Sequence, residues 1–418
     1  MYLSEYVVVD TKGGFLDPLA FMRPASAFQA VLFRQFTGLS NHPAYHGVLC
    51  AVWKYLHDRG LSPTQPGFSR RFREIEIFWG LLNAIQGVPV LNVRKYKPLT
   101  DDNGEFSLRK VPKQHSLYAR LAYGTLGHYT QPSIAWGFLQ PGGKAMTDDG
   151  FQLARAMEDR CSRGFQHWLD CWSRGDTFEL QQCQKLAASL HLLADATRAE
   201  KSLWQAQINR WVEGNPRSRP IWEDPVPLSE LDEAQVKAEA HTAHYHKLVE
   251  RYPTLAEDIV AMSEFERLSG AVQFLFDRKL LKLQFTSSIA LSEPSVLDEL
   301  PGAIVKLARR AAARGSSFEP VKLFSTLAES DPTLEAIETA ICDHHTRHQK
   351  RKGVTAFLDE TGLLVGDTVD PPKYAEVLES LQTINTVEAA MDLLQFRSGR
   401  DWHFRRCRVY SDWTGASP

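Results

Sequence analysis

Two short histidine-rich runs hold the side chains best suited to chemistry in this chain. The runs are HTAHYH, with His241, His244 and His246, and CDHHTRH, with Cys342, His344, His345 and His348. On a helix, residues three or four apart share a face, so each run can present two imidazoles together. Zinc prefers imidazole and thiolate ligands. The runs suggest a metal-dependent hydrolase or nuclease. Neither matches a known zinc motif such as H-E-x-x-H, so solvated helix histidines are the alternative.

Basic residues form a second candidate site. In a helix expected over 302–314, three cations recur every four residues, with Arg309 beside them: Lys306, Arg310 and Arg314. A second basic run contributes Arg347, Lys350, Arg351 and Lys352. Cations spaced along a helix can neutralise successive phosphates of DNA. These sets predict a DNA-binding surface, and an ordinary solvated helix face is the alternative.

The C-terminal segment alternates arginines with aromatic rings. Its arginines are Arg400, Arg405, Arg406 and Arg408, and its rings include Trp402, Phe404, Tyr410 and Trp413. Guanidinium groups bind phosphates and aromatic rings stack on exposed bases, so a nucleic-acid-binding tail is expected. Two alternatives remain open. The segment can pack on the body of the protein with its arginines paired to carboxylates, or it can form a strand with Phe404 and Val409 inward.

The segment 117–157 has the order of a winged-helix module. An apolar helical pattern is followed by SIAWGFLQPGGK, a short ribbon with a Pro-Gly-Gly turn, and then by TDDG, which opens a new helix. In winged-helix modules a helix enters the major groove and the wing contacts the backbone. Lys144 is then expected beside the tip of the wing. An ordinary helical subdomain with a polar hairpin explains the pattern equally well.

No motif in the sequence is specific for catalysis. The chain lacks the P-loop motif, the G-x-G-x-x-G fingerprint and the G-x-S-x-G nucleophile elbow. An ATPase, a kinase or an α/β-hydrolase is therefore not expected, and neither is a bound cofactor.

Composition indicates a globular protein with ordinary cores. Apolar residues make up 43% and charged residues 23% of the 418 residues, and the formal net charge is -2. The N-terminus lacks the pattern of a signal peptide and no apolar run is long enough for a bilayer span, so a cytoplasmic location without membrane contact is expected. The six cysteines show no CxxC spacing and are expected to be reduced.

Hydrophobic periodicity predicts a mainly α fold, multi-helical, with a winged-helix-like segment and small β-hairpins. Four parts are expected: an N-terminal helical domain over 1–110, the winged-helix-like segment with helices over 111–213, a proline-rich linker over 214–227, and a C-terminal helical domain with a basic tail over 228–418. Small β pieces are expected at 6–10, 88–97, 281–285 and 355–367.

Several motifs resemble those of a poorly characterised bacterial family. They include FLDPL at 15–19, GLS at 38–40, RRF at 70–72, TDDGFQLA at 147–154 and HQKRKG at 348–353. Together they resemble accessory proteins of multi-gene anti-phage defence loci, which pair with an SMC-type ATPase and a nuclease. The resemblance covers about half of the chain and brings no catalytic residues with it.

These observations lead to one functional hypothesis and one alternative. The chain is expected to be a non-catalytic subunit of a bacterial defence or DNA-maintenance complex that contacts DNA, docks onto an ATPase or nuclease partner, or does both. Docking would use apolar helix faces, such as the one formed by Phe72, Phe78 and Trp79, if they remain exposed. The metal-dependent hydrolase is the alternative.

Overall fold

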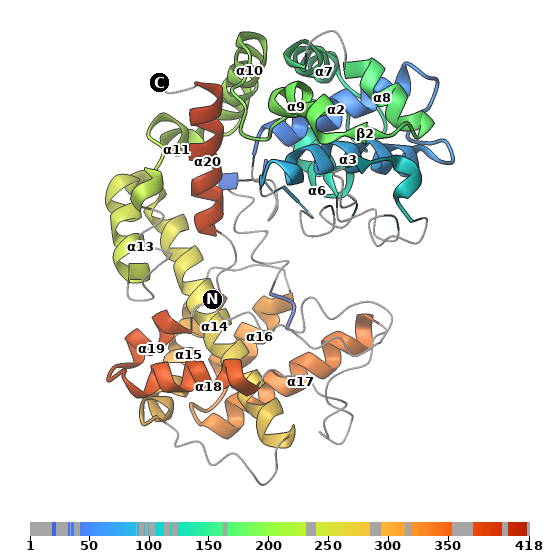
Figure 1. Ribbon diagram of the computed structural model, residues 1–418. Helices are drawn as coiled ribbons and strands as arrows, with labels where there is room; N and C mark the ends of the chain where they lie inside the picture. Colours follow the sequence, from blue (N-terminus) through green and yellow to red (C-terminus); the bar gives the residue numbers. More distant parts are fainter. Residues whose placement is uncertain are drawn as a thin grey trace. The chain divides into compact units, whose positions relative to one another are not determined.

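Helices dominate this computed structural model (Figure 1). It describes residues 19–21, 32–33, 35–36, 42–88, 90–91, 96, 99, 105–112, 118, 124–161, 165–230, 240–284, 294–313, 319–352, 371–394 and 400–415. Within these ranges the side chains of 180, 240–244, 284, 319–321, 352, 371–373 and 400–403 are left undescribed. The prediction of a mainly helical fold is confirmed. The strands expected at 6–10 and 355–367 lie outside the described residues.

The chain divides into two compact units, and each unit is built from two separate stretches of sequence. Residues 32–228 and 401–418 form one unit, called here the α2–α20 unit. Residues 1–31 and 229–400 form the other, called here the α13–α19 unit. The chain therefore passes from one unit to the other three times.

The α2–α20 unit contains most of the shorter helices. Its described elements are α2 (Ala44–His57), α3 (Phe68–Ile85), β1 (Glu105–Phe106), η2 (Leu108–Lys110), α6 (Thr125–Ala135), α7 (Asp148–Arg160), α8 (Phe165–Arg174), β2 (Phe178–Glu179), α9 (Leu180–Ser189), α10 (Arg198–Gly214), η4 (Pro216–Ser218), α11 (Arg219–Glu223) and α20 (Arg400–Thr414). The two strands pair antiparallel, with Phe106 opposite Phe178, and so join distant segments rather than forming a hairpin.

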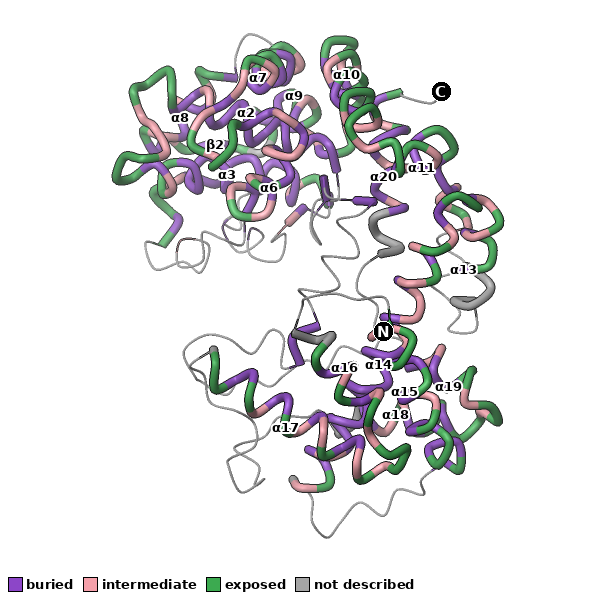
Figure 2. Tube along the Cα trace, turned by 180° about the vertical axis from the view of Figure 1, so that it is seen from behind, coloured by how far each residue is buried: buried purple, intermediate pink, exposed green. Residues whose placement is uncertain are grey.

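Helices α2 and α3 form the core of this unit and are buried along most of their length (Figure 2). Helix α2 is apolar on most sides, as helices enclosed by other elements are, whereas α3 also buries the charged side chains of Arg73, Glu74 and Glu76. Helix α2 packs against α3, α6 and α7. Phe72, Phe78 and Trp79 lie in this core, so the apolar face considered for docking if exposed is buried.

Side-chain caps set where two helices begin. Thr147 accepts a hydrogen bond from the Gly150 amide at 3.2 Å, which confirms that TDDG opens a helix. Thr197 and Glu200 form a reciprocal capping box at the start of α10. In both cases a polar side chain replaces the hydrogen bonds that the first turn of a helix lacks.

A buried hydrogen-bond chain joins α20 to α2 and α6. The imidazole of His46 is hydrogen-bonded to the Ser133 hydroxyl at 2.7 Å and to the Tyr410 hydroxyl at 3.0 Å. All three side chains are fully buried. The Tyr410 ring also packs against the rings of Trp136 and Trp204, at centroid distances of 5.9 and 5.3 Å. The C-terminal helix is thus an integral part of the core of the α2–α20 unit.

Removing one hydroxyl from this chain tests the role of α20. Tyr410→Phe is expected to lower the free energy of unfolding of the α2–α20 unit by about 1–3 kcal/mol, because one ring nitrogen of His46 stays buried without a partner. Amide hydrogen exchange along α20 should accelerate accordingly. Unchanged exchange along α20 would mean that the hydrogen bond contributes nothing to its docking.

The α13–α19 unit is arranged around one long helix, α14 (Figure 1). Its described elements are α13 (Ala240–Arg251), η5 (Pro253–Leu255), α14 (Ala256–Gln284), α15 (Val296–Ala313), α16 (Glu319–Glu329), α17 (Leu334–Lys352), α18 (Pro371–Gln382) and α19 (Val387–Leu393). Helix α15 packs along α16, and α14 contacts α13, α15, α17, α18 and α19. Leu19 and Phe21, from the N-terminal stretch, are part of this hydrophobic core.

The structure differs from the predicted domain boundaries. The stretches 1–110 and 111–213 were expected to be separate, yet α2 and α3 pack against α6, α7, α8 and α9 within one unit. The predicted linker over 214–227 contains η4 and α11, because Ile221 and Trp222 are buried and hold the segment against the unit. The chain changes unit between residues 228 and 229.

Several predicted elements also differ in detail. The expected strand over 281–285 is helical through 284, where α14 ends. Proline is common at the first position of a helix, so Pro301 predicts a helix start, but it lies inside α15, which begins at Val296. Apolar periodicity predicts single helices over 150–173 and 372–396, but the first segment forms α7 and α8 and the second forms α18 and α19. Winged-helix topology is not confirmed, since residues 113–117 and 119–123 lie outside the described residues.

No helix in the described ranges has both the length and the apolar character needed to cross a lipid bilayer.

Candidate functional site

The cations expected on α15 are exposed. Lys306, Arg309 and Arg310 lie on the outward face of the last two turns of the helix. Arg310 contacts a Glu264 carboxylate oxygen at 3.2 Å, and 55% of its side chain remains exposed. Arg309 donates through Nε to the Ala328 carbonyl at 3.0 Å, which fixes its guanidinium. Arg314 lies outside the described residues.

The basic end of α17 is exposed as well. Arg347, Lys350 and Arg351 lie on the outward face of its last turns, and Asp343 is exposed one turn earlier. Cations near the end of a helix interact favourably with its carbonyl terminus, so this charge order also stabilises the helix. The side chain of Lys352 is not among those described.

The expected nucleic-acid-binding tail is instead a helix packed in a core. Arg406 is 2% exposed, and burial lowers its pKa to about 10. Arg408 is paired with Asp412 at 2.8 Å and Arg405 is half-buried. Phe404 and Tyr410 are fully buried. The segment therefore corresponds to the packed alternative and is neither an open tail nor a strand. The side chains of Arg400 and Trp402 lie outside the description.

Lys144 is exposed at the tip of a tight turn between α6 and α7. Leu139 and Met146 pair across the turn, and the Gln140 amide donates to the Ala145 carbonyl at 2.9 Å. Gly142 and Gly143 have φ values of 86° and 61°, which side chains with a Cβ rarely adopt. The short ribbon expected here is present, but Lys144 belongs to a different unit from the cations of α15 and α17.

The histidines of the second run face the interior rather than a common metal. His344 has Nε2 3.3 Å from the Leu19 carbonyl, and burial lowers its pKa to about 4. His345 is fully buried with its ring 4.8 Å from that of Phe276. Among the side chains described, no three histidine, cysteine or carboxylate groups converge in a way that could hold a metal ion. His241 and His244 lie outside that set.

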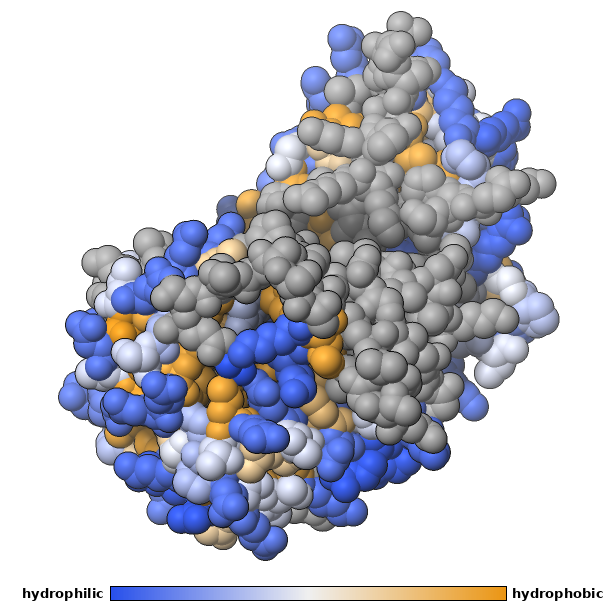
Figure 3. Space-filling view, turned by 90° about the horizontal axis from the view of Figure 1, so that it is seen from below, coloured by the Kyte–Doolittle hydropathy of each residue, from blue (hydrophilic) through white to orange (hydrophobic). Residues whose placement is uncertain are grey.

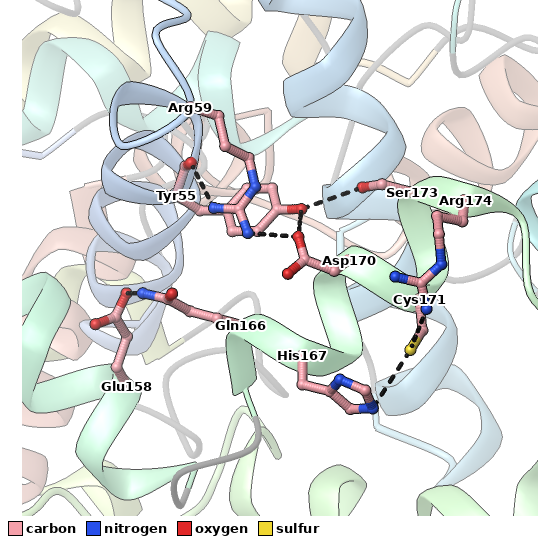
Figure 4. A network of polar contacts seen from close by, with 9 residues as sticks. All are labelled: Tyr55, Arg59, Glu158, Gln166, His167, Asp170, Cys171, Ser173 and Arg174. Atoms are coloured by element: carbon pink, nitrogen blue, oxygen red, sulfur yellow. Dashed lines mark hydrogen bonds and ion pairs between the residues drawn. The ribbon is translucent and has the colours of Figure 1, made fainter.

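A polar network that no sequence motif predicts lies between α2 and α8 (Figure 4). The Tyr55 hydroxyl donates to Asp170 at 2.7 Å, and the Arg59 guanidinium also contacts this carboxylate. Burial acts to raise the pKa of Asp170, but the hydrogen bonds from Tyr55 and Arg59 outweigh it and lower the pKa. The guanidinium of Arg59 also stacks over the Tyr55 ring at 3.6 Å. Asp170 is thus held as an anion that ties α8 to α2.

On the same helix, a cysteine lies between a histidine and an arginine (Figure 4). The Sγ of Cys171 is 3.5 Å from Nε2 of His167, one turn earlier. Nη2 of Arg174 donates to this sulfur at 3.1 Å and to Asp176 at 2.9 Å. His167 and Arg174 are exposed and Cys171 is half-exposed. A His and a Cys four residues apart in FQHWLDCWSR was the sequence signal for this group, because that spacing places both on one face of a helix.

Apolar surface is sparse on the described part of the molecule. Hydrophilic residues cover much of the face in Figure 3, with hydrophobic residues in small patches between them. The large hydrophobic side chains that remain exposed among the described residues are Leu193 and Val260. Leu193 belongs to the α2–α20 unit and Val260 to the α13–α19 unit.

Comparison with known proteins finds no family model, no curated protein and no solved structure that matches the chain.

Proposed function

We propose that the protein is a non-catalytic subunit that binds DNA through the exposed cations of α15 and α17. The observation that supports this most directly is the set of three neighbouring cations on the last two turns of α15: Lys306, Arg309 and Arg310. A helix face of this kind contacts the phosphate backbone and carries no base-specific information.

Local interactions hold two of these cations in place without neutralising the face. Arg309 is anchored through Nε to a backbone carbonyl, which leaves its terminal nitrogens for other contacts. Arg310 has one carboxylate neighbour, Glu264, whose side chain is 12% exposed, whereas the Arg310 side chain is 55% exposed. Because Glu264 is recessed, a phosphate approaching from solvent meets the guanidinium before it meets the carboxylate.

The second basic stretch, on α17, belongs to the same unit and contributes Arg347, Lys350 and Arg351. Non-specific DNA affinity grows with the number of phosphates that are neutralised, so two such stretches bind more strongly than one. The arginines of α20 are left out of this proposal, since they are buried, half-buried or paired within a core.

The wider context is a bacterial defence or DNA-maintenance complex with an SMC-type ATPase and a nuclease as partners. It is supported by the sequence resemblance alone. In such a complex the α13–α19 unit would contact DNA, and partner proteins would supply the catalytic activity.

Charge reversal on α15 tests the proposal. Lys306→Glu combined with Arg310→Glu is expected to weaken binding to a short fluorescent DNA duplex by about 10-fold or more at 0.1 M salt. The slope of log affinity against log salt concentration should become shallower by about 2, because roughly one counterion fewer is released for each lost phosphate contact. Fluorescence anisotropy across a salt series measures both quantities.

A matched control uses two exposed cations of the other unit. Lys185→Glu combined with Arg198→Glu changes the net charge by the same amount, and should leave affinity and salt slope close to those of the unmodified protein. If both double variants weaken binding equally, the effect reflects net charge and α15 is not a DNA-binding surface. If the unmodified protein fails to bind DNA at low salt, the proposed function is wrong.

A further inference from the structure

Cys171 differs from the other cysteines of the chain in its surroundings. Four of them are buried, namely Cys50, Cys161, Cys183 and Cys407. Cys342 is half-exposed like Cys171, but burial raises its pKa to about 11. A thiol needs its deprotonated form to react as a nucleophile, and burial disfavours that form. Cys342 is therefore a natural internal reference for Cys171.

Two polar side chains contact the Cys171 sulfur, one able to accept a proton and one positively charged. His167 can accept the thiol proton through Nε2, which lies 3.5 Å from Sγ. Arg174 directs an N–H at the sulfur from 3.1 Å, and a guanidinium in this position stabilises negative charge. The same Nη2 also donates to Asp176 at 2.9 Å, and this hydrogen bond raises the pKa of Arg174. The side chains of His167, Cys171 and Arg174 extend from one face of α8 (Figure 4).

We propose that Cys171 is a redox-reactive thiol whose substrate is a small hydroperoxide. His167 takes the thiol proton, and the thiolate attacks the terminal oxygen of the hydroperoxide. A sulfur–oxygen bond forms as the oxygen–oxygen bond breaks, so sulfur is oxidised to a sulfenic acid and the peroxide is reduced. The departing hydroxide or alkoxide takes the proton from His167 and leaves as water or an alcohol.

The surroundings explain why a small reagent is the fitting substrate. Cys171 is only partly exposed, between the exposed His167 and Arg174, so a small reagent is best able to reach the sulfur from solvent. The neighbouring carboxylate, Asp170, is engaged by Tyr55 and Arg59 and is thereby held away from the sulfur chemistry. The inference is independent of DNA binding, because α8 and the cations of α15 belong to different units.

Trapping of the sulfenic acid tests the proposal on the full chain. The reduced protein is treated with hydrogen peroxide in the presence of dimedone, and the labelled cysteines are identified by peptide mass spectrometry. Cys171 is expected to be labelled at least about 10-fold faster than Cys342, since thiolate character governs the rate. Cys171→Ser should remove the fast label without increasing label at other positions.

Two further variants separate the proposed roles from simple exposure. His167→Gln and Arg174→Gln should each slow the labelling of Cys171 by about 3- to 10-fold while the cysteine stays exposed. His246→Gln and Arg198→Gln change exposed residues of the same types elsewhere and should leave the rate unchanged. Equal labelling of Cys171 and Cys342, or an unchanged rate in both α8 variants, would overturn the proposal. Circular dichroism verifies that every variant is folded.

Discussion

Replacing Arg73 by methionine should destabilise the α2–α20 unit by about 3–5 kcal/mol, which is the usual cost of leaving a buried charge without its partner. Arg73 and Glu76 lie one turn apart on α3, are each 1% exposed, and form an ion pair at 2.7 Å. Glu76 also accepts a hydrogen bond from the Thr125 amide at the start of α6. Loss of Arg73 therefore leaves the Glu76 carboxylate inside the core without this cation, while it still accepts the hydrogen bond from the Thr125 amide at the start of α6.

A double variant distinguishes this cost from a simple loss of packing. Arg73→Met combined with Glu76→Gln removes both charges but keeps an oxygen that can accept from Thr125. The double variant should recover part of the loss, because no uncompensated charge remains. If it is as unstable as Arg73→Met alone, the main contribution of Arg73 is packing rather than charge pairing.

The tryptophans provide a probe that is specific to this unit. All ten lie within residues 32–228 and 401–418. Urea unfolding followed by tryptophan fluorescence therefore reports the α2–α20 unit without interference from the other one. The midpoint and the slope together give the change in the free energy of unfolding.

Acidification is expected to have a comparable effect on the same unit. Burial lowers the pKa of His46 to about 3, and burial with the nearby Arg160 charge lowers that of His42 to about 3, from an ordinary value of 6.5. Both are neutral in the folded protein but take up a proton on unfolding below pH 6.5. Stability should therefore fall as the pH is lowered from about 6.5 toward 3, by about 2 kcal/mol for each histidine at pH 5.

A matched substitution assigns part of this pH dependence to one residue. His42 accepts a hydrogen bond from the Ala44 amide through Nδ1, at 3.2 Å, and the side-chain oxygen of asparagine can replace that atom. His42→Asn should remove about 2 kcal/mol of the stability difference between pH 7 and pH 5. His57→Gln alters a histidine whose side chain is 62% exposed, and should leave the difference unchanged. An identical pH dependence in His42→Asn would refute the assignment.

The periodicity of apolar residues along the sequence predicted the helices correctly where those residues are buried in the structure. Apolar periodicity predicts helices over 44–59 and 69–85, and the observed α2 and α3 match these ranges within about two residues. The cap at Thr147 could also be predicted, because a capping side chain and the helix that it caps are neighbours in sequence. The start of α15 was harder to predict from the sequence, because Pro301 lies within the first turns of the helix instead of at its beginning.

Most of the wrong predictions concern residues whose contacts in the structure are made by residues far away in the sequence. The arginines of the C-terminal segment suggested an open tail, because nothing near them shows that Tyr410 meets His46 from 364 positions away. The proline-rich stretch 214–227 suggested a linker for the same reason, and Trp222 is buried by rings such as those of Phe36 and Trp136. The Cys171 group was missed because a histidine and a cysteine form a site only when Arg174 turns back toward them.

The interleaved course of the chain has a consequence for how the protein is made. The α2–α20 unit begins with residue 32, but its last helix is synthesised only after the 172 residues of 229–400 that belong to the other unit. At 5–20 residues per second, the ribosome needs roughly 10–35 s for that interval. During it, Trp136, Trp204 and His46 have no Tyr410 to cover them. Nascent chains that stall in this interval should be prime targets for chaperones that recognise exposed aromatic clusters.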